Sequence, residues 1–180
     1  RPRGESVAKR MDLSVVIPVR NEAGNIAPLV FEIRAALAGL AVYEIVYVDD
    51  GRDDATAAEI RRLQPDLPQV RLVCHARSFG QSAAIRSGVL AARGELIMTL
   101  DADLQDDPRE IPNFLARLDG GLDVVSGWKK VRLGPWHKVW PSRVFNWLVG
   151  RVTGVKLHDH NCGMKAYRAA VFREVKLYGE

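Results

Sequence analysis

Short apolar runs alternate along this chain with longer segments whose apolar residues recur three and four positions apart. The apolar runs cover residues 13–19, 43–48, 70–74, 95–100 and 123–126, and we expect a strand at each. The helical spacing predicts helices over residues 25–40, 54–63, 79–92 and 111–118. Strands separated by single helices are typical of an α/β fold, with a mainly parallel central sheet flanked by helices.

A polar cluster follows each of the first four predicted strands, at residues 18–22, 49–51, 77–81 and 101–105. Because the carboxyl ends of parallel strands share one edge of a sheet, we expect these clusters to line one rim. Acids, turn amides and helix N-termini at such a rim suit a nucleotide diphosphate. No Gly-x-Gly-x-x-Gly follows the first strand and no Gly-Lys-Ser/Thr loop occurs, which argues against a dinucleotide oxidoreductase or a P-loop enzyme.

Asp101 and Asp103 directly follow the fourth apolar run. In an extended chain, residues two apart point the same way, so both carboxylates can face one point and repel each other unless a cation lies between them. Hard oxygen ligands indicate Mg²⁺ or Mn²⁺. A lone Asp-x-Asp is more often a solvated turn, and the strand context favours the metal here. A calcium loop is excluded, because it would need Gly at its sixth position and Glu at its twelfth, where Asp106 and Pro112 stand.

Composition and charge are those of an ordinary globular protein. Of 180 residues, 47% are hydrophobic and 27% charged, and the formal net charge of +4 is too small to indicate nucleic acid. Two cysteines do not make a disulfide framework. No apolar run approaches the roughly 18 residues of a membrane span. We expect a basic flexible leader at residues 1–10 without a signal peptide, followed by a single domain over residues 11–180 that is truncated at its C-terminus.

Four motifs, taken in order, resemble those of family 2 glycosyltransferases. They are residues 14–22, 48–56, 77–84 and 98–106, and the resemblance extends from residue 13 to 180. The chain is most similar to the polyprenyl-phosphate group of that family, which resembles dolichol-phosphate mannose synthase. The resemblance implies the GT-A fold, a Rossmann-like domain with a mainly parallel sheet.

The resemblance also implies roles for individual residues. A divalent ion would be held by Asp101, Asp103 and Gln105, and would bridge the diphosphate of the donor. The donor-binding set would be Pro18, Arg20, Glu22, Val48, Asp50, Asp101, Ala102, Asp103, Gln105 and Lys129. Catalysis would involve Asp103, Lys129 and Asp159. The chain departs from the family pattern at Arg20, where Tyr is common, and at Arg52, where Ser is common.

Residues 124–158 contain no Asp or Glu, and they hold all four tryptophans of the chain. Basic groups interleaved with Trp suit an anionic headgroup surface, although such a Trp stripe is also compatible with core packing. The resemblance implies that Lys138, Ser142 and Arg143 bind the phosphate of a lipid acceptor. No RNA-binding sheet motif appears, so nucleic acid is not an expected partner.

His158, His160 and Cys162 could bind a soft metal, but a structural zinc site needs four convergent ligands. Residues 159–168 instead resemble the motif that places Asp159 near the donor sugar and the acceptor.

The expected function is metal-dependent transfer of a sugar, with inversion, from a UDP- or GDP-sugar to polyprenyl or dolichyl phosphate. The expected location is the cytoplasmic face of a membrane, with the protein peripheral or anchored by segments outside this chain. Two alternatives are a glycosyltransferase with a soluble sugar or polysaccharide acceptor, and a non-catalytic module that binds nucleotide sugar or membrane.

Overall fold

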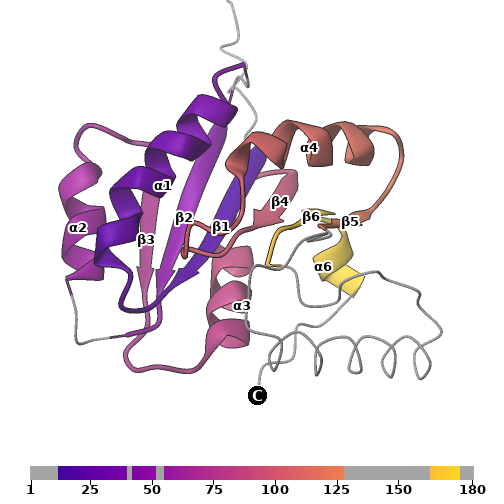
Figure 1. Cartoon of the computed structure of the whole chain (residues 1–180). Coiled ribbons are helices and arrows are strands. Elements are labelled where there is room, and N and C mark those ends of the chain that lie inside the picture. The colour runs from indigo at the N-terminus through magenta and orange to yellow at the C-terminus, as the bar shows by residue number, and fades with distance from the viewer. Residues whose placement is uncertain (1–11, 40–41, 52–54, 128–162, 175–180) are drawn as a thin grey trace, which may run out of the picture.

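The computed structural model describes residues 12–39, 42–51, 55–127 and 163–174 (Figure 1). The chain alternates strands and helices as the apolar pattern predicts. In order, the elements are β1 (Leu13–Val19), α1 (Ala23–Ala36), β2 (Tyr43–Asp49), α2 (Thr56–Leu63), β3 (Val70–Cys74), α3 (Gln81–Ala91), β4 (Leu96–Thr99), the 3₁₀ turn η1 (Pro108–Glu110), α4 (Ile111–Asp119), β5 (Val124–Ser126), β6 (Lys165–Arg168) and α6 (Val171–Glu174).

The strands form a six-stranded sheet in the order β3-β2-β1-β4-β6-β5. The pairs β1–β2, β1–β4 and β2–β3 are parallel, whereas β6 runs antiparallel to both β4 and β5. The predicted α/β fold with a mainly parallel, helix-flanked sheet is therefore confirmed. The sequence pattern did not predict β6, which separates β5 from the parallel strands.

Two apolar layers cover the two faces of the sheet, because successive side chains of a strand point to opposite faces. Val15 and Ile17 of β1 pack with α1, α2 and α4 in the larger core. Val16, between them in the sequence, packs with Ala84 and Val89 of α3 in the smaller core. Figure 1 shows this sandwich, with α1 and α4 on one face and α3 on the other.

Helix boundaries differ from the predicted ones where backbone geometry intervenes. Helix α1 ends at Ala36 rather than at residue 40, and the Leu37 N–H closes it on the Ile33 carbonyl at 2.9 Å. Helix α3 begins at Gln81 rather than at residue 79, because Gly80 has a φ of 91°, which a helix cannot contain. None of the helices within the described ranges has both the length and the hydropathy of a membrane-spanning segment.

A buried charge joins the strands at their amino ends. Glu44 is 1% exposed and accepts hydrogen bonds from Ser14 Oγ at 2.6 Å and from the Arg71 guanidinium at 2.6 Å. The Arg93 N–H donates to the same carboxylate at 2.7 Å, and the Gly94 N–H donates to Ser14 Oγ at 2.9 Å. This network fixes the turn between α3 and β4 to β1 and β2, at the opposite end of the sheet from the predicted polar rim.

Candidate functional site at the carboxyl edge of the sheet

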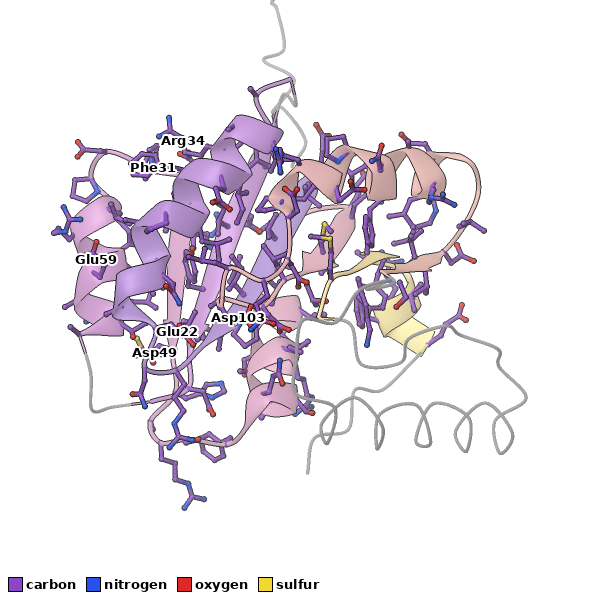
Figure 2. The ribbon with its side chains drawn as sticks, viewed as in Figure 1. Glu22, Phe31, Arg34, Asp49, Glu59 and Asp103 are labelled. Atoms are coloured by element: carbon purple, nitrogen blue, oxygen red, sulfur yellow. The ribbon has the colours of Figure 1, made fainter. Side chains whose placement is uncertain are left out.

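Backbone hydrogen bonds hold the ends of the parallel strands in register at the carboxyl edge. The Asp50 N–H donates to the Val19 carbonyl at 2.9 Å, and the His75 N–H donates to the Asp49 carbonyl at 2.9 Å. In Figure 2, Glu22, Asp49 and Asp103 lie toward this end of the sheet, whereas Phe31 and Arg34 lie toward the other end of α1. The four polar clusters therefore share one rim, as the parallel topology predicts.

The segment after β1 turns sharply and brings two predicted site residues to the rim. Asn21 adopts a positive φ of 58°, which lets the chain reverse into α1. The Glu22 N–H donates to Thr56 Oγ1 at 3.1 Å, and its carboxylate accepts from the Asn25 amide at 2.5 Å. Arg20 is exposed, and its stem lies against Gly51, where an added Cβ would be 3.3 Å from Arg20 Cγ. Arg20 and Glu22 thus both lie at the rim, between β1 and α1.

Two of the predicted donor-binding residues belong to the core. The Val48 side chain is fully buried in the smaller core, and Ala102 is 5% exposed in the larger one. A side-chain contact between Val48 and a nucleotide does not fit this burial, because an inward-facing residue of β2 is covered by α3. Pro18 is half-buried at the end of β1, where it pairs in register with Val48.

The Asp50 carboxylate is 6% exposed and accepts four hydrogen bonds from the loop between β3 and α3. Oδ1 accepts from the Phe79 N–H at 2.8 Å and pairs with His75 Nδ1 at 2.7 Å. Oδ2 accepts from Ser78 Oγ and from the Gly80 N–H, both at 2.8 Å. Burial by itself would raise the pKa of this carboxyl, but the hydrogen bonds outweigh burial and hold the pKa below its usual range.

Asp101 and Asp103 lie in the turn after β4, and they differ in their surroundings. Asp101 is half-buried, and its Oδ1 accepts from Gln81 Nε2 at 3.0 Å. Asp103 is exposed, and its Oδ1 accepts the Gln105 N–H at 3.0 Å across a turn in which Leu104 has a positive φ of 59°. In this turn the Asp101 carboxylate is therefore held by a side-chain hydrogen bond, and the Asp103 carboxylate is exposed to solvent.

Gln105 lines a groove of about 550 Å³ between α1 and the turn after β4. Glu32 and Leu104 also line this groove. The predicted metal-binding role of Gln105 stays a prediction, because the described contact of this residue with the carboxylate pair is made by its backbone N–H.

Several predicted site residues lie outside the described residues. They are Lys129, Lys138, Ser142, Arg143 and Asp159, together with the soft-metal candidates His158, His160 and Cys162. Their roles stay predictions.

The structure also brings to the rim residues to which the sequence assigned no role. Gln81 contacts Asp101, and His75 links Asp50 to Ser87 Oγ through its Nε2 at 2.8 Å. Gly163 packs on the Asp101 carboxylate, and its carbonyl accepts from Thr99 Oγ1 at 2.9 Å. Gln81 and Gly163 both stand within motifs that carried the family resemblance, which is the signal that could have drawn attention to them.

The family model described as "Glycosyl transferase family 2" matches residues 14–176 of the chain. The chain belongs to this family. The match spans all four motifs and every described strand apart from the first residue of β1.

Two curated relatives of this glycosyltransferase domain are 42% identical to it. The dodecaprenyl-phosphate galacturonate synthase of Rhizobium johnstonii matches over 174 residues, which is 94% of this chain and 52% of the relative. The undecaprenyl-phosphate 4-deoxy-4-formamido-L-arabinose transferase of Pseudomonas aeruginosa matches over 161 residues, which is 88% of this chain and 48% of the relative. The chain spans about half the length of these relatives.

Solved glycosyltransferases share the fold. A mannosyltransferase from Pyrobaculum calidifontis, in complex with GDP-Man and Mn²⁺, superposes with a TM-score of 0.69 at 24% identity, covering 93% of this chain and 47% of the other. Glucosyl-3-phosphoglycerate synthase from Mycobacterium tuberculosis, in complex with Mn²⁺, UDP and glucosyl-3-phosphoglycerate, gives a TM-score of 0.71 at 19% identity, covering 90% of this chain and 58% of the other. The GT-A fold expected from the resemblance is therefore confirmed.

The Asp101 and Asp103 carboxylates suit a divalent ion that also binds phosphate and water. Within the ranges that the structure describes, no three His, Cys, Asp or Glu side chains gather as a metal site. Asp101 and Asp103 can supply two hard oxygen ligands, which suits Mg²⁺ or Mn²⁺ that completes its coordination with phosphates and water. The described side chains do not supply enough ligands to complete the coordination of an ion by themselves.

Proposed function

We propose that this domain catalyses metal-dependent transfer of a sugar, with inversion, from a UDP- or GDP-sugar to polyprenyl phosphate. The observation that carries the proposal is the carboxylate pair Asp101 and Asp103 at the end of β4, on the rim of a GT-A sheet. The same rim presents Arg20 and Glu22, which can bind the base and the ribose of the donor.

The relatives support polyprenyl phosphate as the acceptor. Two relatives that are 42% identical to this chain over most of its length are named for such lipids. One is a dodecaprenyl-phosphate galacturonate synthase, and the other is an undecaprenyl-phosphate 4-deoxy-4-formamido-L-arabinose transferase. In the proposed complex Lys138, Ser142 and Arg143 bind the acceptor phosphate, and the basic, Trp-rich segment lies at the cytoplasmic face of a membrane. We do not propose a nucleic acid partner.

Transfer of a sugar to a phosphate oxygen needs little acid–base catalysis from the protein. A polyprenyl phosphate already carries a nucleophilic oxyanion, so no strong general base is required. The ion held by Asp101 and Asp103 would act as a Lewis acid on the leaving diphosphate. The protein residues bind and orient the two substrates, with Lys129 offsetting phosphate charge and Asp159 orienting the sugar or the acceptor.

Calorimetric titration tests the donor half of the proposal. UDP and GDP are each titrated with Mn²⁺ and with EDTA into the wild type, Asp103→Ala and Asp107→Asn. Asp107 is the matched control, because it is an exposed carboxylate of the same turn that pairs with Arg109. We expect one of the two nucleotides to bind when Mn²⁺ is present and not when EDTA is present. Asp103→Ala should lose this binding, and Asp107→Asn should keep it. Absence of binding of either nucleotide to folded wild type would overturn the proposal.

A transfer assay tests the acceptor half. A panel of UDP- and GDP-hexoses is incubated with a short-chain polyprenyl phosphate in detergent, and in parallel with the unphosphorylated polyprenol as the control and with soluble sugars as competing acceptors. We expect sugar to appear on the phosphate-bearing lipid alone, and less of it in Arg143→Ala. Transfer to a soluble sugar with none to the lipid would establish the soluble-acceptor alternative, and nucleotide binding without any transfer would indicate a non-catalytic module.

A further inference from the structure

The His75 side chain lies between the Asp50 carboxylate and helix α3. Its Nδ1 is 2.7 Å from Asp50 Oδ1, and its Nε2 is 2.8 Å from Ser87 Oγ. Only 11% of the His75 side chain is exposed. Both imidazole nitrogens therefore have a protein partner, and the ring cannot turn without breaking one of the two contacts.

The direction of these two hydrogen bonds follows from the charge of Asp50. Although burial raises the pKa of the Asp50 carboxyl, its hydrogen bonds hold that pKa below the usual range, so the group is ionised at neutral pH. An ionised carboxylate can only accept, and Nδ1 of His75 must then carry the proton. In a neutral imidazole the other nitrogen is an acceptor, so Nε2 accepts the hydroxyl hydrogen of Ser87. Ser87 thereby favours the tautomer in which His75 donates to Asp50.

Both ends of this hydrogen-bonded chain are fixed by the fold. The His75 N–H donates to the Asp49 carbonyl at 2.9 Å, which holds the end of β3 beside β2. Ser87 precedes Gly88, where α3 lies so close to the sheet that an added Cβ would overlap Val16 of β1. The position of the imidazole is therefore set by β2 on one side and by α3 on the other.

The orientation of the Asp50 carboxylate decides what this group can bind. Only 6% of the Asp50 side chain is exposed, so a modest rotation would turn the exposed part away from the rim. Its other hydrogen bonds come from Ser78 and from the Phe79 and Gly80 N–H groups, all in the loop between β3 and α3. Among these four donors, His75 is the one whose side chain also contacts the body of α3. It therefore ties the orientation of the carboxylate to the packed part of the fold.

We propose that His75 is a positioning residue of the donor site: held by Ser87, it orients the Asp50 carboxylate for a hydrogen bond from the base or the ribose of the nucleotide. This role rests on the function proposed above and on the predicted donor-binding role of Asp50. The hydrogen bonds of His75 to Asp50 and Ser87 do not depend on that function.

The tautomer of His75 tests the direction of the hydrogen bonds in the ligand-free protein. Nitrogen-15 spectra of the imidazole groups are recorded at about pH 8.5, where a free imidazole is neutral. The signals that disappear in His75→Asn are those of His75. We expect the proton on Nδ1. A proton on Nε2 would mean that His75 does not donate to Asp50, and it would overturn the proposal.

Two substitutions of His75 separate its hydrogen bond to Asp50 from its packing. The amide nitrogen of an Asn side chain is as many bonds from the backbone as Nδ1, whereas the longer Gln places its amide near the position of Nε2. In Mn²⁺ we expect His75→Gln to bind UDP or GDP about tenfold more weakly than wild type, and His75→Asn to recover most of that loss. Urea denaturation checks that both variants are folded.

Equal losses in the two variants would contradict the positioning role. Both substitutions remove the imidazole ring, which contacts the Phe79 ring edge to face at 5.4 Å between centroids. An equal loss in His75→Asn and His75→Gln would show that this ring contact matters and that the hydrogen bond to Asp50 does not. That result would overturn the proposal.

A double-mutant cycle tests whether His75 acts through Asp50. If it does, Asp50→Asn combined with His75→Gln loses no more affinity than Asp50→Asn alone. Ser87→Ala should weaken binding about threefold. Leu90→Ala, at an exposed position of the same helix, is the control and should leave the affinity unchanged. Additive losses in the double variant, or equal affinities in Ser87→Ala and Leu90→Ala, would overturn the proposal.

The two kinds of readout separate the positioning role from the proposed function. If the wild type binds neither nucleotide, the proposed function fails, and the tautomer still decides whether His75 donates to Asp50. If the wild type binds a nucleotide with Mn²⁺ and His75→Gln binds it equally well, the donor site stands and the positioning role falls.

Discussion

Gly163 lies against the carboxylate of Asp101, so that a Cβ at residue 163 would overlap it, with even Asp101 Oδ1 only 2.7 Å away. These two residues are far apart in the sequence, and they meet because β6 runs antiparallel beside β4. In its observed orientation, the Asp101 carboxylate occupies the space that a side chain at residue 163 would need.

We expect Gly163→Ala to damage the site more than the fold. The clashing atoms belong to the end of the Asp101 side chain, which can rotate away from the new methyl group. Metal-dependent nucleotide affinity should fall about tenfold or more, while the free energy of unfolding changes by about 1 kcal/mol or less. Titration calorimetry and urea denaturation measure the two effects. Gly24→Ala is the control, because a Cβ at Gly24 meets nothing within 4 Å. A large loss of stability with intact binding would contradict this account.

The lowered pKa of Asp50 predicts a dependence of stability on acid. Because the folded protein binds a proton at Asp50 less readily than the unfolded chain does, this group stabilises the fold above its ordinary pKa of 3.8. That contribution is lost as the pH falls below 3.8 toward the lower pKa of the folded state. In Asp50→Asn we expect lower stability at pH 7 and a shallower decline below about pH 4. Urea denaturation from pH 3 to pH 7 checks this, and parallel curves for variant and wild type would refute it.

The buried Glu44 predicts a stability defect that leaves the site intact. Arg71→Met removes a charge-assisted hydrogen bond from a carboxylate that is 1% exposed, which should cost about 2 kcal/mol of unfolding free energy. Arg62→Met removes an exposed, solvent-screened ion pair with Glu59 and should lower the unfolding free energy much less than Arg71→Met does. Since the network lies at the amino ends of the strands, nucleotide affinity should be unchanged in both. Equal costs in the two variants would count against the burial argument.

Substitution of Gly94 is expected to lower the stability of the folded protein. A Cβ at Gly94 would lie 2.6 Å from Ser14 N and 2.8 Å from the Leu96 carbonyl oxygen, and these backbone atoms belong to paired strands that cannot yield. We expect Gly94→Ala to destabilise the protein by about 3 kcal/mol or more. Thermal denaturation compared with Gly24→Ala measures this, and a melting temperature equal to that of the control would disprove it.

Much of the fold follows from local patterns in the sequence. The apolar runs around Ile17, Tyr47 and Met98 predicted their strands, and single helices between strands predicted the parallel sheet and its polar rim. Strand β6 escaped prediction because Lys165–Arg168 is four residues long and begins and ends with a charge. Its pairing with β4 depends on a contact between distant parts of the chain.

The sequence pattern located the candidate site residues, but it did not predict the contacts that each of them makes. Asp101 and Asp103 follow a buried strand, and that context located them at the rim. The hydrogen bonds of Asp50 could not be foreseen, because they depend on the backbone path of the Ser78–Gly80 loop. The burial of Val48 under α3 likewise depends on which face of β2 each residue takes.

The described chain leaves the sheet after Gly127 and returns at Gly163, and the Gly127 N–H donates to the Met164 carbonyl at 2.9 Å, which closes the two ends against each other. Residues 128–162 therefore connect two points of the chain that are hydrogen-bonded to each other. In the proposed function, Lys138, Ser142 and Arg143 of this segment bind the acceptor phosphate, and Lys129 and Asp159 of the same segment act on the phosphates and the sugar. Exchange of this segment between relatives would therefore change acceptor recognition together with the contacts of Lys129 and Asp159, and would leave Asp101 and Asp103 at the end of β4.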